Sequence, residues 1–431
     1  MQSAENQKTS SAGSATQPSG TAASTEHEPR IRAGALREEL ASLIDVVGGA
    51  ALVDVLLERA FELRGTDIHL DPQEAGLRTR IRVDGMLHDV LQAPPQVGIQ
   101  MVSRLKLMAN MDIAEKRLPQ DGHFTQRRGD RRRDVRVATA PTTDGERIVL
   151  RLLPEHQFLT SLEDLGMEGT QADTVRDFLK IPYGMILSVG PVGSGKTTTM
   201  YSCLQALHDP SRSLATIEDP VEHRVVGVNQ MQVDPRIDFH FVDGLRALLR
   251  QDPNVMMVGE IRDRETAQIA VRAGLTGVLV LSTMHANDAP GSVDIFRQFD
   301  LPSMLLADAL VGVISQRLLR RVCAECREAY SPSPAVCEQV GLDSNSPPPI
   351  YRGRGCDACF STGYFGRTGV FEVMRVDETL SNAILHGASR AEIRDAAVSA
   401  GMTTLQESAA AKVREGLTTV EEMHRVLTAF P

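Results

Sequence analysis

The spacing of hydrophobic residues changes several times along the chain, and each change predicts a different kind of structure. Residues 1–32 contain almost no large apolar side chains, so burial cannot offset the entropy lost on ordering, and we expect a disordered tail. Between Leu36 and Leu63 apolar residues recur at helical spacing. This pattern predicts two helices separated by a break near Gly48-Gly49.

Apolar and polar residues then alternate, as in strands of a half-buried sheet. Asp84-Gly85 lies between two such segments and predicts a hairpin turn. One helix is expected over 102–109, and together these elements predict a small α+β domain over 33–154. The segments expected to be strands are 66–70, 77–83, 86–91, 134–140 and 147–153.

A third pattern, short apolar runs separated by helical stretches, follows an expected linker at 155–165. Strands that alternate with helices are typical of a parallel α/β sheet. We therefore expect an α/β domain over 166–320, ending in a helix over 304–319. Its strands are expected at 186–190, 213–217, 255–258 and 277–283, and its other helices at 172–179, 198–208, 241–249 and 266–273.

The last part of the chain has two different residue patterns. Turn-forming residues and four paired cysteines dominate residues 321–369, which predicts a separate small module. Helical periods return afterwards and predict a helical C-terminal region over 370–431. Helices are expected there around 380–385, 391–398 and 409–417.

Composition narrows the classes of function. The chain has 431 residues and a formal net charge of −10, so the molecule as a whole is not built to coat nucleic acid or an anionic membrane. The N-terminus lacks a charged-then-apolar signal region, and no run of about 18 apolar residues occurs. We therefore expect a cytoplasmic protein without a membrane span of its own.

One basic segment opposes the net charge. Residues 127–134 carry five arginines, which could contact nucleic acid phosphates. Aromatic side chains for base stacking are missing beside them. A solvated hairpin tip around Gly129-Asp130 is therefore the favoured interpretation.

A glycine-rich loop lies between a predicted strand and a predicted helix. The pattern Gly-x-x-x-x-Gly-Lys-Thr in this context is typical of a P-loop, whose backbone N–H groups surround nucleotide phosphates. Lys196 would reach the β and γ phosphates, and the hydroxyl of Thr197 would bind Mg²⁺. The residues expected to bind ATP are Gly190, Pro191, Val192, Gly193, Ser194, Gly195, Lys196, Thr197 and Thr198.

Three polar residues follow the strands that come after the P-loop. Because an open parallel sheet places the carboxyl ends of its strands beside the ligand, we expect these residues near the nucleotide. Glu260 is the candidate for orienting the attacking water, and Glu218 is the candidate for a second acid near the metal. His285 could sense the γ-phosphate, although a histidine at a strand end is more often structural.

The cysteines indicate a separate metal site. Two C-x₂-C pairs, Cys323/Cys326 and Cys356/Cys359, are separated by a long connection. This spacing suits four thiolates around one structural Zn²⁺, with no ligand position left open for catalysis. Cys203 and Cys337 are interpreted as ordinary thiols.

Several long motifs resemble one family. Residues 248–263, including Gly259-Glu260-Ile-Arg262-Asp263, closely resemble the signature of the secretion-superfamily ATPases, the hexameric motors of type II secretion and type IV pilus assembly. The resemblance covers about residues 36–420. Further motifs in the right order are 215–222, which resembles the Asp box, 275–289, which resembles the His box, and 66–70, 82–85, 104–114 and 117–122, which resemble the N-terminal domain.

The resemblance implies an architecture and a set of roles. It implies a RecA-like P-loop NTPase core, a preceding small α+β (PAS-like) domain, a tetracysteine zinc insert and a helical C-terminal region. Glu260 matches the Walker B acid, Glu218 the Asp-box acid and His285 the second histidine of the His box. Arg136 and Arg151 match arginines of the N-terminal domain that reach the nucleotide in such motors.

The resemblance also implies partners. Such motors are homohexamers that hydrolyse ATP with Mg²⁺ and act on inner-membrane platform proteins, so the chain is expected to be peripheral to the inner membrane, with no direct nucleic acid ligand. Two departures from the family stand out. Val278 occupies the position of the usual first His-box histidine, and the platform-docking domain that commonly precedes Leu36 is expected to be reduced to a tail and short helices.

Two other functions stay open from the sequence. The arginine-rich segment would suit a RecA-like motor that translocates DNA. A nucleotide-dependent scaffold that does not hydrolyse ATP would carry the same P-loop. Secretion, pilus assembly and competence machines are not distinguished by these motifs.

Overall fold

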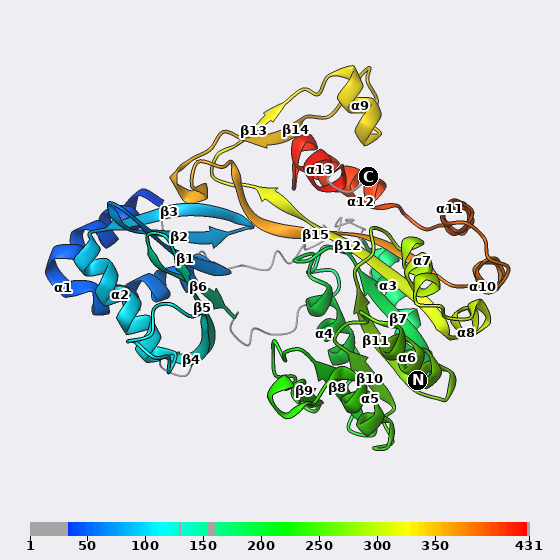
Figure 1. Cartoon of the computed structure of the whole chain (residues 1–431). Coiled ribbons are helices and arrows are strands. Elements are labelled where there is room, and N and C mark those ends of the chain that lie inside the picture. Colours follow the sequence, from blue (N-terminus) through cyan, green and yellow to red (C-terminus); the bar gives the residue numbers. More distant parts are fainter. Residues whose placement is uncertain (1–32, 129–130, 154–160, 429–431) are drawn as a thin grey trace, which may run out of the picture. The chain divides into compact units, whose positions relative to one another are not determined.

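We describe residues 33–128, 131–153 and 161–428 of a computed structural model of the chain. The predicted tail over 1–32, and most of the predicted linker over 155–165, lie outside these residues. The elements are shown in Figure 1.

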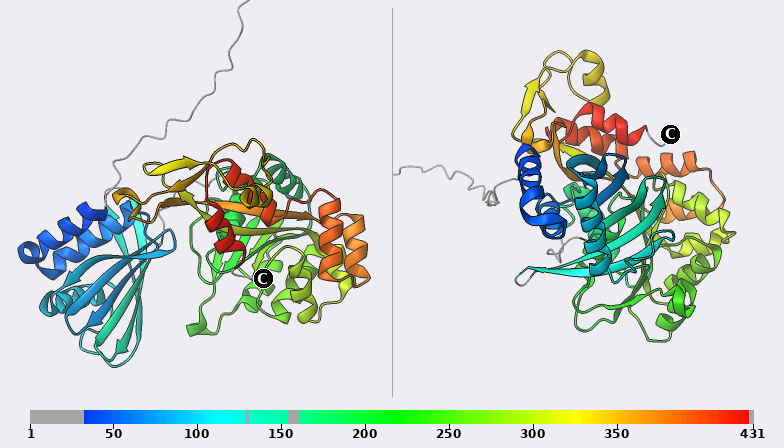
Figure 2. Two further views of the ribbon diagram at one scale, coloured as in Figure 1. Left: turned by 90° about the horizontal axis from the view of Figure 1, so that it is seen from above. Right: turned by 60° about the vertical axis from the view of Figure 1, so that its left-hand side comes forward.

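The first structured part of the chain is a six-stranded antiparallel sheet with two helices. The strand order is β3-β2-β1-β6-β5-β4. The helices share one hydrophobic core with the sheet (Figure 2). The elements are α1 (Ala33–Glu62), β1 (Asp67–Gln73), β2 (Gly76–Val83), β3 (Met86–Ala93), α2 (Pro95–Met108), β4 (Gln120–Arg128), β5 (Arg131–Thr142) and β6 (Gly145–Leu152).

The local sequence explains these elements. In β2 buried and partly buried positions alternate, as the apolar–polar pattern predicts. The hairpin turn at Asp84-Gly85 is confirmed, and both residues have positive φ, 49° and 85°. The predicted break in the first helical segment is also confirmed, because Gly48 interrupts α1 with a φ of 71°. Helix α2 begins at Pro95, earlier than predicted, since proline fits the first turn of a helix.

The arginine-rich segment lies on a hairpin. Arg127 pairs with Arg132 across β4 and β5, so strands flank Gly129-Asp130, which themselves lie outside the described residues. The strand assignment agrees with a hairpin, the favoured interpretation of this segment.

A seven-stranded sheet forms the second part of the chain. The strand order is β15-β12-β7-β11-β10-β8-β9, and all neighbours are parallel except β15, which runs antiparallel to β12. The predicted parallel sheet is therefore confirmed. Its strands are β7 (Gly184–Val189), β8 (Leu214–Glu218), β9 (Asn229–Gln232), β10 (Val255–Val258), β11 (Leu279–Met284), β12 (Leu310–Val322) and β15 (Tyr364–Arg375).

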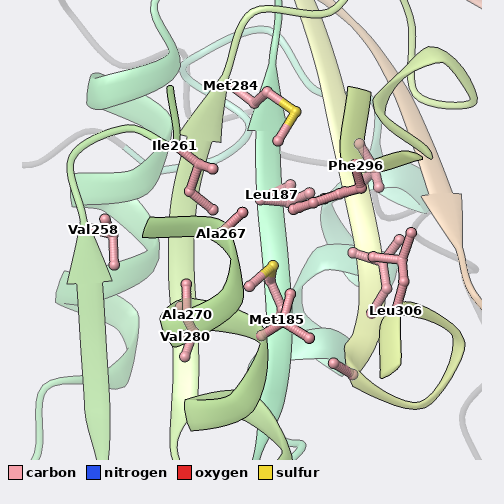
Figure 3. Packing of buried hydrophobic residues seen from close by; sticks show 14 of the residues in the cluster. Met185, Leu187, Val258, Ile261, Ala267, Ala270, Val280, Met284, Phe296 and Leu306 are labelled. Carbon is pink, nitrogen blue, oxygen red and sulfur yellow. The ribbon is translucent and has the colours of Figure 1, made fainter. Parts of the chain in front are cut away.

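Helices connect these strands. Helices α6, α7 and α8 cover one face, where Met185, Leu187 and Val280 of the sheet pack against Ala267 and Phe296 (Figure 3). The helices are α3 (Gly169–Leu179), α4 (Lys196–Leu207), η1 (Pro235–Ile237), α5 (Phe241–Leu249), α6 (Arg264–Leu275), α7 (Gly291–Gln298) and α8 (Ser303–Ala309).

The prediction of a helix over 304–319 is wrong beyond Ala309. Helix α8 ends there, and Leu310 begins the long strand β12. Its buried residues include the β-branched Val313 and Ile314, which suit a strand enclosed between two neighbours. The apolar residues of this segment do not alternate with polar ones, because both faces of this inner strand are buried, and their spacing therefore resembled that of a helix.

The rest of the chain contains the cysteine module and a group of helices. The expected helical region from Val370 is corrected at its start, since β15 extends to Arg375 and pairs with β12. The remaining elements are β13 (Arg327–Tyr330), α9 (Pro334–Val340), β14 (Ile350–Gly353), η2 (Asp357–Cys359), α10 (Glu378–Leu385), α11 (Arg390–Ser399), α12 (Leu405–Arg414) and α13 (Val420–Leu427).

Side-chain caps begin all four C-terminal helices. Asp377, Ser389, Thr404 and Thr419 each accept a backbone N–H hydrogen bond from the first turn. None of the described helices combines the length and apolar character needed to cross a bilayer.

Candidate nucleotide-binding site

The glycine-rich loop joins β7 to α4. Gly190 follows the last residue of β7 with a φ of 153°, and Gly195 precedes the first residue of α4 with a φ of 90°. A Cβ atom on Gly190 would lie 2.6 Å from the backbone oxygen of Gln316. Glycine is required there because β12 passes so close to the loop. The strand–loop–helix context predicted for a P-loop is confirmed.

Lys196 points back along the loop. Its side-chain nitrogen donates hydrogen bonds to the backbone oxygens of Gly190 and Pro191, both at 3.0 Å. Burial, together with the positive charge of Arg317, lowers its pKa to about 8. The ammonium group is therefore held where phosphate oxygens would be bound by a P-loop lysine.

The hydroxyl-bearing residues of the loop have different environments. Thr197 is partly buried in the first turn of α4, whereas Thr198 is exposed. Thr199 is buried and donates a 2.7 Å hydrogen bond to Oε1 of Gln316. Thr197 and Thr198 thus remain the hydroxyls available to a bound Mg²⁺–nucleotide.

Glu260 and His285 meet at the carboxyl ends of neighbouring parallel strands. Glu260 follows β10 and His285 follows β11. Nε2 of His285 lies 3.4 Å from Oε2 of Glu260. The two residues were predicted separately from their positions, and the structure brings them together.

The other nitrogen of His285 faces the P-loop. Nδ1 lies 3.2 Å from the backbone oxygen of Gly190 and 3.5 Å from the nitrogen of Lys196. Burial and then the charge of Lys196 lower the pKa of His285. The imidazole is therefore neutral at neutral pH, and it lies between Glu260 and the backbone of the glycine-rich loop.

Arg262 also contacts Glu260, forming an ion pair with its carboxylate. A second carboxylate, that of Asp219, lies 3.8 Å from Arg262. Arg262 was not among the predicted site residues, although it belongs to the motif that carries Glu260. Its spacing, two residues after a strand-end acid, was the available signal.

Glu218 ends β8 and is almost fully buried. Oε1 accepts hydrogen bonds from Thr216 at 2.5 Å and from Gln230 at 3.1 Å. Oε2 accepts a hydrogen bond from the hydroxyl of Tyr201, which lies on α4. Both oxygens are therefore already bound within the protein, which suits a carboxylate of fixed position and charge.

Glu222 lies beyond Glu218 in the same loop. Its side chain is exposed to solvent. The neighbouring protein nevertheless removes part of the water around the carboxyl group, which raises its pKa, and the charge of Glu218 raises the pKa further. The charges of Arg136, Arg151 and Lys196 act in the opposite direction. The charge of Lys196 in the glycine-rich loop thus opposes the charge of Glu218 at this carboxyl group.

Arg136 and Arg151 are direct neighbours in their own sheet. They are paired across β5 and β6, so both side chains lie on the same face. Arg151 is mostly exposed and has a long ion pair, 3.4 Å, with Asp67. The two arginines therefore form one basic pair rather than two unrelated surface charges.

Sequence reasoning missed three buried residues that support the loop. Nε2 of Gln316 donates a 2.6 Å hydrogen bond to the backbone oxygen of Ser194, and its Oε1 accepts from Ser188 at 3.2 Å. Arg317, next to it, lowers the pKa of Lys196. Tyr201 holds Glu218. Gln316 and Arg317 escaped notice because their segment was interpreted as a helix outside the site.

The four predicted cysteines form a cluster. The sulfur atoms of Cys323, Cys326, Cys356 and Cys359 all lie within 4.8 Å of one another. Neighbouring Sγ–Sγ distances are 3.7 to 3.9 Å, close to the roughly 3.8 Å that tetrahedral Zn–S bonds of about 2.3 Å would impose. The donor set and geometry fit zinc.

Backbone groups favour the thiolate form of one cysteine of this cluster, Cys359. The N–H groups of Cys356 and Gly363 both donate to Sγ of Cys359 at 3.2 Å. Burial would raise the pKa of Cys359, yet these hydrogen bonds lower it overall. Cys203 and Cys337 are buried free thiols outside the cluster, in agreement with their predicted role.

A P-loop at the carboxyl end of an inner strand of a parallel sheet, with an acid and a histidine after the next two strands in the sheet, is typical of a RecA-like P-loop NTPase. The profile of the family described as "Type II/IV secretion system protein" matches residues 48–425. The chain therefore belongs to this family, and it is an ATPase of the secretion type.

Individual relatives agree with this assignment. The Type II secretion system protein E of Pseudomonas aeruginosa is 44% identical over 375 residues, which cover 87% of this chain and 74% of the relative. The Type IV pilus assembly ATPase PilB of Myxococcus xanthus is 40% identical over 393 residues, 90% of this chain and 69% of the relative. The crystal structure of the pilus retraction motor PilT with bound ADP is similar, with a TM-score of 0.61, 25% identity, and coverage of 86% of this chain and 96% of that one.

Proposed function

We propose that the chain hydrolyses ATP to power a type II secretion system or the assembly of a type IV pilus or pseudopilus, acting as a homohexamer at the cytoplasmic side of the inner membrane. The observation that carries the proposal is that His285 lies between Glu260 and Lys196 of the P-loop, within 3.4 Å of the first and 3.5 Å of the second. The names of the Pseudomonas and Myxococcus relatives support these machines.

Each residue has a role in this proposal. The backbone of residues 190–195 and Lys196 bind the phosphates, and Thr197 contributes to the Mg²⁺ shell. Glu260 orients the attacking water, and His285 connects Glu260 to the loop through hydrogen-bonding distances on both ring nitrogens. Bound Mg²⁺ would neutralise phosphate charge in the transition state.

Glu218 and the arginine pair complete the site. Glu218, fixed by Tyr201 and Thr216, supplies negative charge at a set distance from the metal. Arg136 and Arg151 are proposed to contact the phosphates and stabilise the charge that develops during transfer. Their effect on the pKa of Glu222 supports a location beside the nucleotide. Catalysis would then require residues from both sheets.

The cysteine cluster is proposed to bind one structural Zn²⁺. Cys323, Cys326, Cys356 and Cys359 would supply four thiolates and leave no position open for water. Zinc would join the segment before β13 to the segment before β15, next to the point where Val322 pairs with Tyr364 and the N–H of Cys323 donates a 2.9 Å hydrogen bond to the backbone oxygen of Gly363. This role is independent of ATP hydrolysis.

The proposal predicts a specific pattern of activity and binding. Purified chain should release phosphate from ATP, and Glu260→Gln should lower turnover by at least about 100-fold while nucleotide binding is kept, because the phosphate-binding groups are unchanged. Lys196→Ala should lose both. Turnover that is equal in wild type and Glu260→Gln would contradict the assignment of the site.

The machine is tested separately. Glu260→Gln with ATP should remain in the ATP-bound state and retain inner-membrane platform proteins from solubilised membranes, whereas Lys196→Ala should not. Hydrolysis stimulated by DNA and lost steeply with added salt would instead support a DNA-translocating motor.

A further inference from the structure

The segment that follows β11 connects the nucleotide site to the C-terminal helices. His285, at its start, faces Gly190 and Glu260. Asp288, three residues later, contacts helix α11 and is 5% exposed. The proposed function uses only the first end of this segment.

Asp288 is bound by two arginines of helix α11. Oδ2 accepts a 2.6 Å hydrogen bond from Nη2 of Arg390 and another from Nη2 of Arg394. Oδ1 accepts from Nε of Arg390 at 3.1 Å and from the backbone N–H of Gly291 at 2.7 Å. Charge-assisted hydrogen bonds of this kind are about twice as strong as neutral ones.

The residues on either side of Asp288 are held from the same direction. The backbone oxygen of Asn287 accepts a 2.5 Å hydrogen bond from Arg317, and the backbone N–H of Ala289 donates a 2.8 Å bond to Glu372. Both partners are buried, on β12 and β15. Three consecutive residues are thus fixed by strands β12 and β15 and by helix α11.

The arginines are not simply packed into a core. Arg390 and Arg394 keep 41% and 37% of their side-chain surface exposed, at the edge of a cleft of about 460 Å³. Helices α11, α12 and α13 all contribute to its walls. Helix α11 therefore reaches the segment through these charged groups at its surface, while Ile393 and Ala397 of the same helix pack into the hydrophobic core that contains Ala289.

We propose that Arg390 and Arg394 are positioning residues for His285, acting through Asp288. They fix the far end of the segment, and thereby fix the imidazole between the P-loop and Glu260. The same contacts transmit the nucleotide state to α11. This inference rests on the proposed ATP hydrolysis, since it assigns a role in that reaction.

Kinetics of paired variants test the positioning role. Arg390→Gln with Arg394→Gln should lower kcat by about 10- to 100-fold, because small displacements of reacting groups have effects of this size. KM for ATP should change less than about threefold, since the phosphate-binding residues are untouched. Arg390→Lys with Arg394→Lys should recover part of kcat, and Asp395→Ala, on the exposed side of the same helix, should match wild type.

A background without the imidazole separates positioning from general destabilisation. If the arginines act through His285, then adding both glutamine changes to His285→Ala should cause little further loss of kcat. The proposal would be overturned if the glutamine changes lowered kcat by the same factor with and without His285. It would also be overturned if they lowered kcat, raised KM and lowered Tm together.

Hydrogen exchange gives a test that does not depend on turnover. A non-hydrolysable ATP analogue should slow amide exchange in residues 390–399 of the wild type, and Asp288→Asn should abolish this response while analogue binding is kept. If the analogue leaves amide exchange in α11 unchanged, the proposed coupling is refuted even if the chain hydrolyses ATP. Absence of turnover, with an α11 that responds to the analogue, would instead contradict only the proposed function.

Discussion

Nε2 of His285 lies 3.4 Å from Oε2 of Glu260, while Nδ1 of the same ring lies 3.2 Å from the backbone oxygen of Gly190. One imidazole thus spans the distance between Glu260, which we propose to orient the attacking water, and the glycine-rich loop. Because the pKa of His285 is lowered, first by burial and then by Lys196, the ring is neutral at neutral pH. A neutral ring has one donor and one acceptor nitrogen, so it can donate from Nε2 to Glu260 while Nδ1 accepts from the Lys196 ammonium, 3.5 Å away.

His285→Ala should lower kcat by about tenfold or more with little change in KM for ATP, because it removes an interaction around the transferring phosphoryl group and leaves the phosphate cradle intact. Steady-state kinetics at saturating Mg²⁺ would check this. The matched control is His386→Ala, in the C-terminal region outside the site, which should match wild type. A KM effect alone would show that His285 serves only ground-state binding.

The pKa of Lys196 predicts a proton-linked nucleotide affinity. In the free protein this pKa is lowered to about 8, and bound phosphates would raise it again. Affinity should therefore be fully present below pH 8, where the ammonium is already charged, and should fall as pH rises above 8, by up to about tenfold per unit.

Calorimetry of ATP-analogue binding in buffers of different ionisation enthalpy should show proton uptake at pH 8.5 and almost none at pH 6.5. Lys196→Arg keeps its charge at all these pH values, so any binding it retains should lack the proton uptake. Equal uptake in this variant would assign the linkage to another group.

The sequence predicted much of this site because P-loop chemistry is local. Gly190 to Thr198 carry their role within nine neighbouring residues, and Glu260 and His285 are found at strand ends that a parallel sheet must bring together. The cysteine pairs are equally informative, since their spacing alone suggested the four-sulfur cluster that the structure shows.

The support behind the loop could not be predicted in this way. Gln316 and Arg317 belong to a strand buried on both faces, where the apolar pattern resembles that of a helix. The hydrogen bond of Gln316 to Ser194 and the effect of Arg317 on the pKa of Lys196 depend on β12 lying next to β7, which is a relationship between segments more than 100 residues apart. Likewise, nothing local joins Asp288 to Arg390.

Tyr201→Phe should weaken the position of Glu218. The phenol donates to Oε2 of Glu218 and accepts hydrogen bonds from the N–H groups of Glu222 and His223 at 3.2 and 3.4 Å. Removal of the hydroxyl leaves Oε2 of the buried Glu218 and two partly buried N–H groups without this partner, at a cost of about 1–3 kcal/mol in the free energy of unfolding.

Chemical denaturation should show that loss for Tyr201→Phe. Titration of the ATPase with Mg²⁺ should show a raised half-saturating concentration, because a carboxylate near the metal has lost its fixed position. Tyr183→Phe is the matched control, since Tyr183 is 52% exposed and should behave as wild type. Normal stability and Mg²⁺ dependence in Tyr201→Phe would mean that Thr216 and Gln230 suffice to hold Glu218.

Zinc is expected at about one ion per chain and should be lost in Cys323→Ser and in Cys356→Ser, because the two cysteines lie on different segments of one tetrahedral site. Metal analysis after gel filtration would measure it. Cys337→Ser is the control, since this buried cysteine lies outside the cluster and should leave the zinc content unchanged.

ATP binding should survive in all three variants, as the cluster contributes nothing to the P-loop. Full zinc retention in both cluster variants would rule out the four-cysteine site, and zinc loss in Cys337→Ser as well would indicate that the module had unfolded instead.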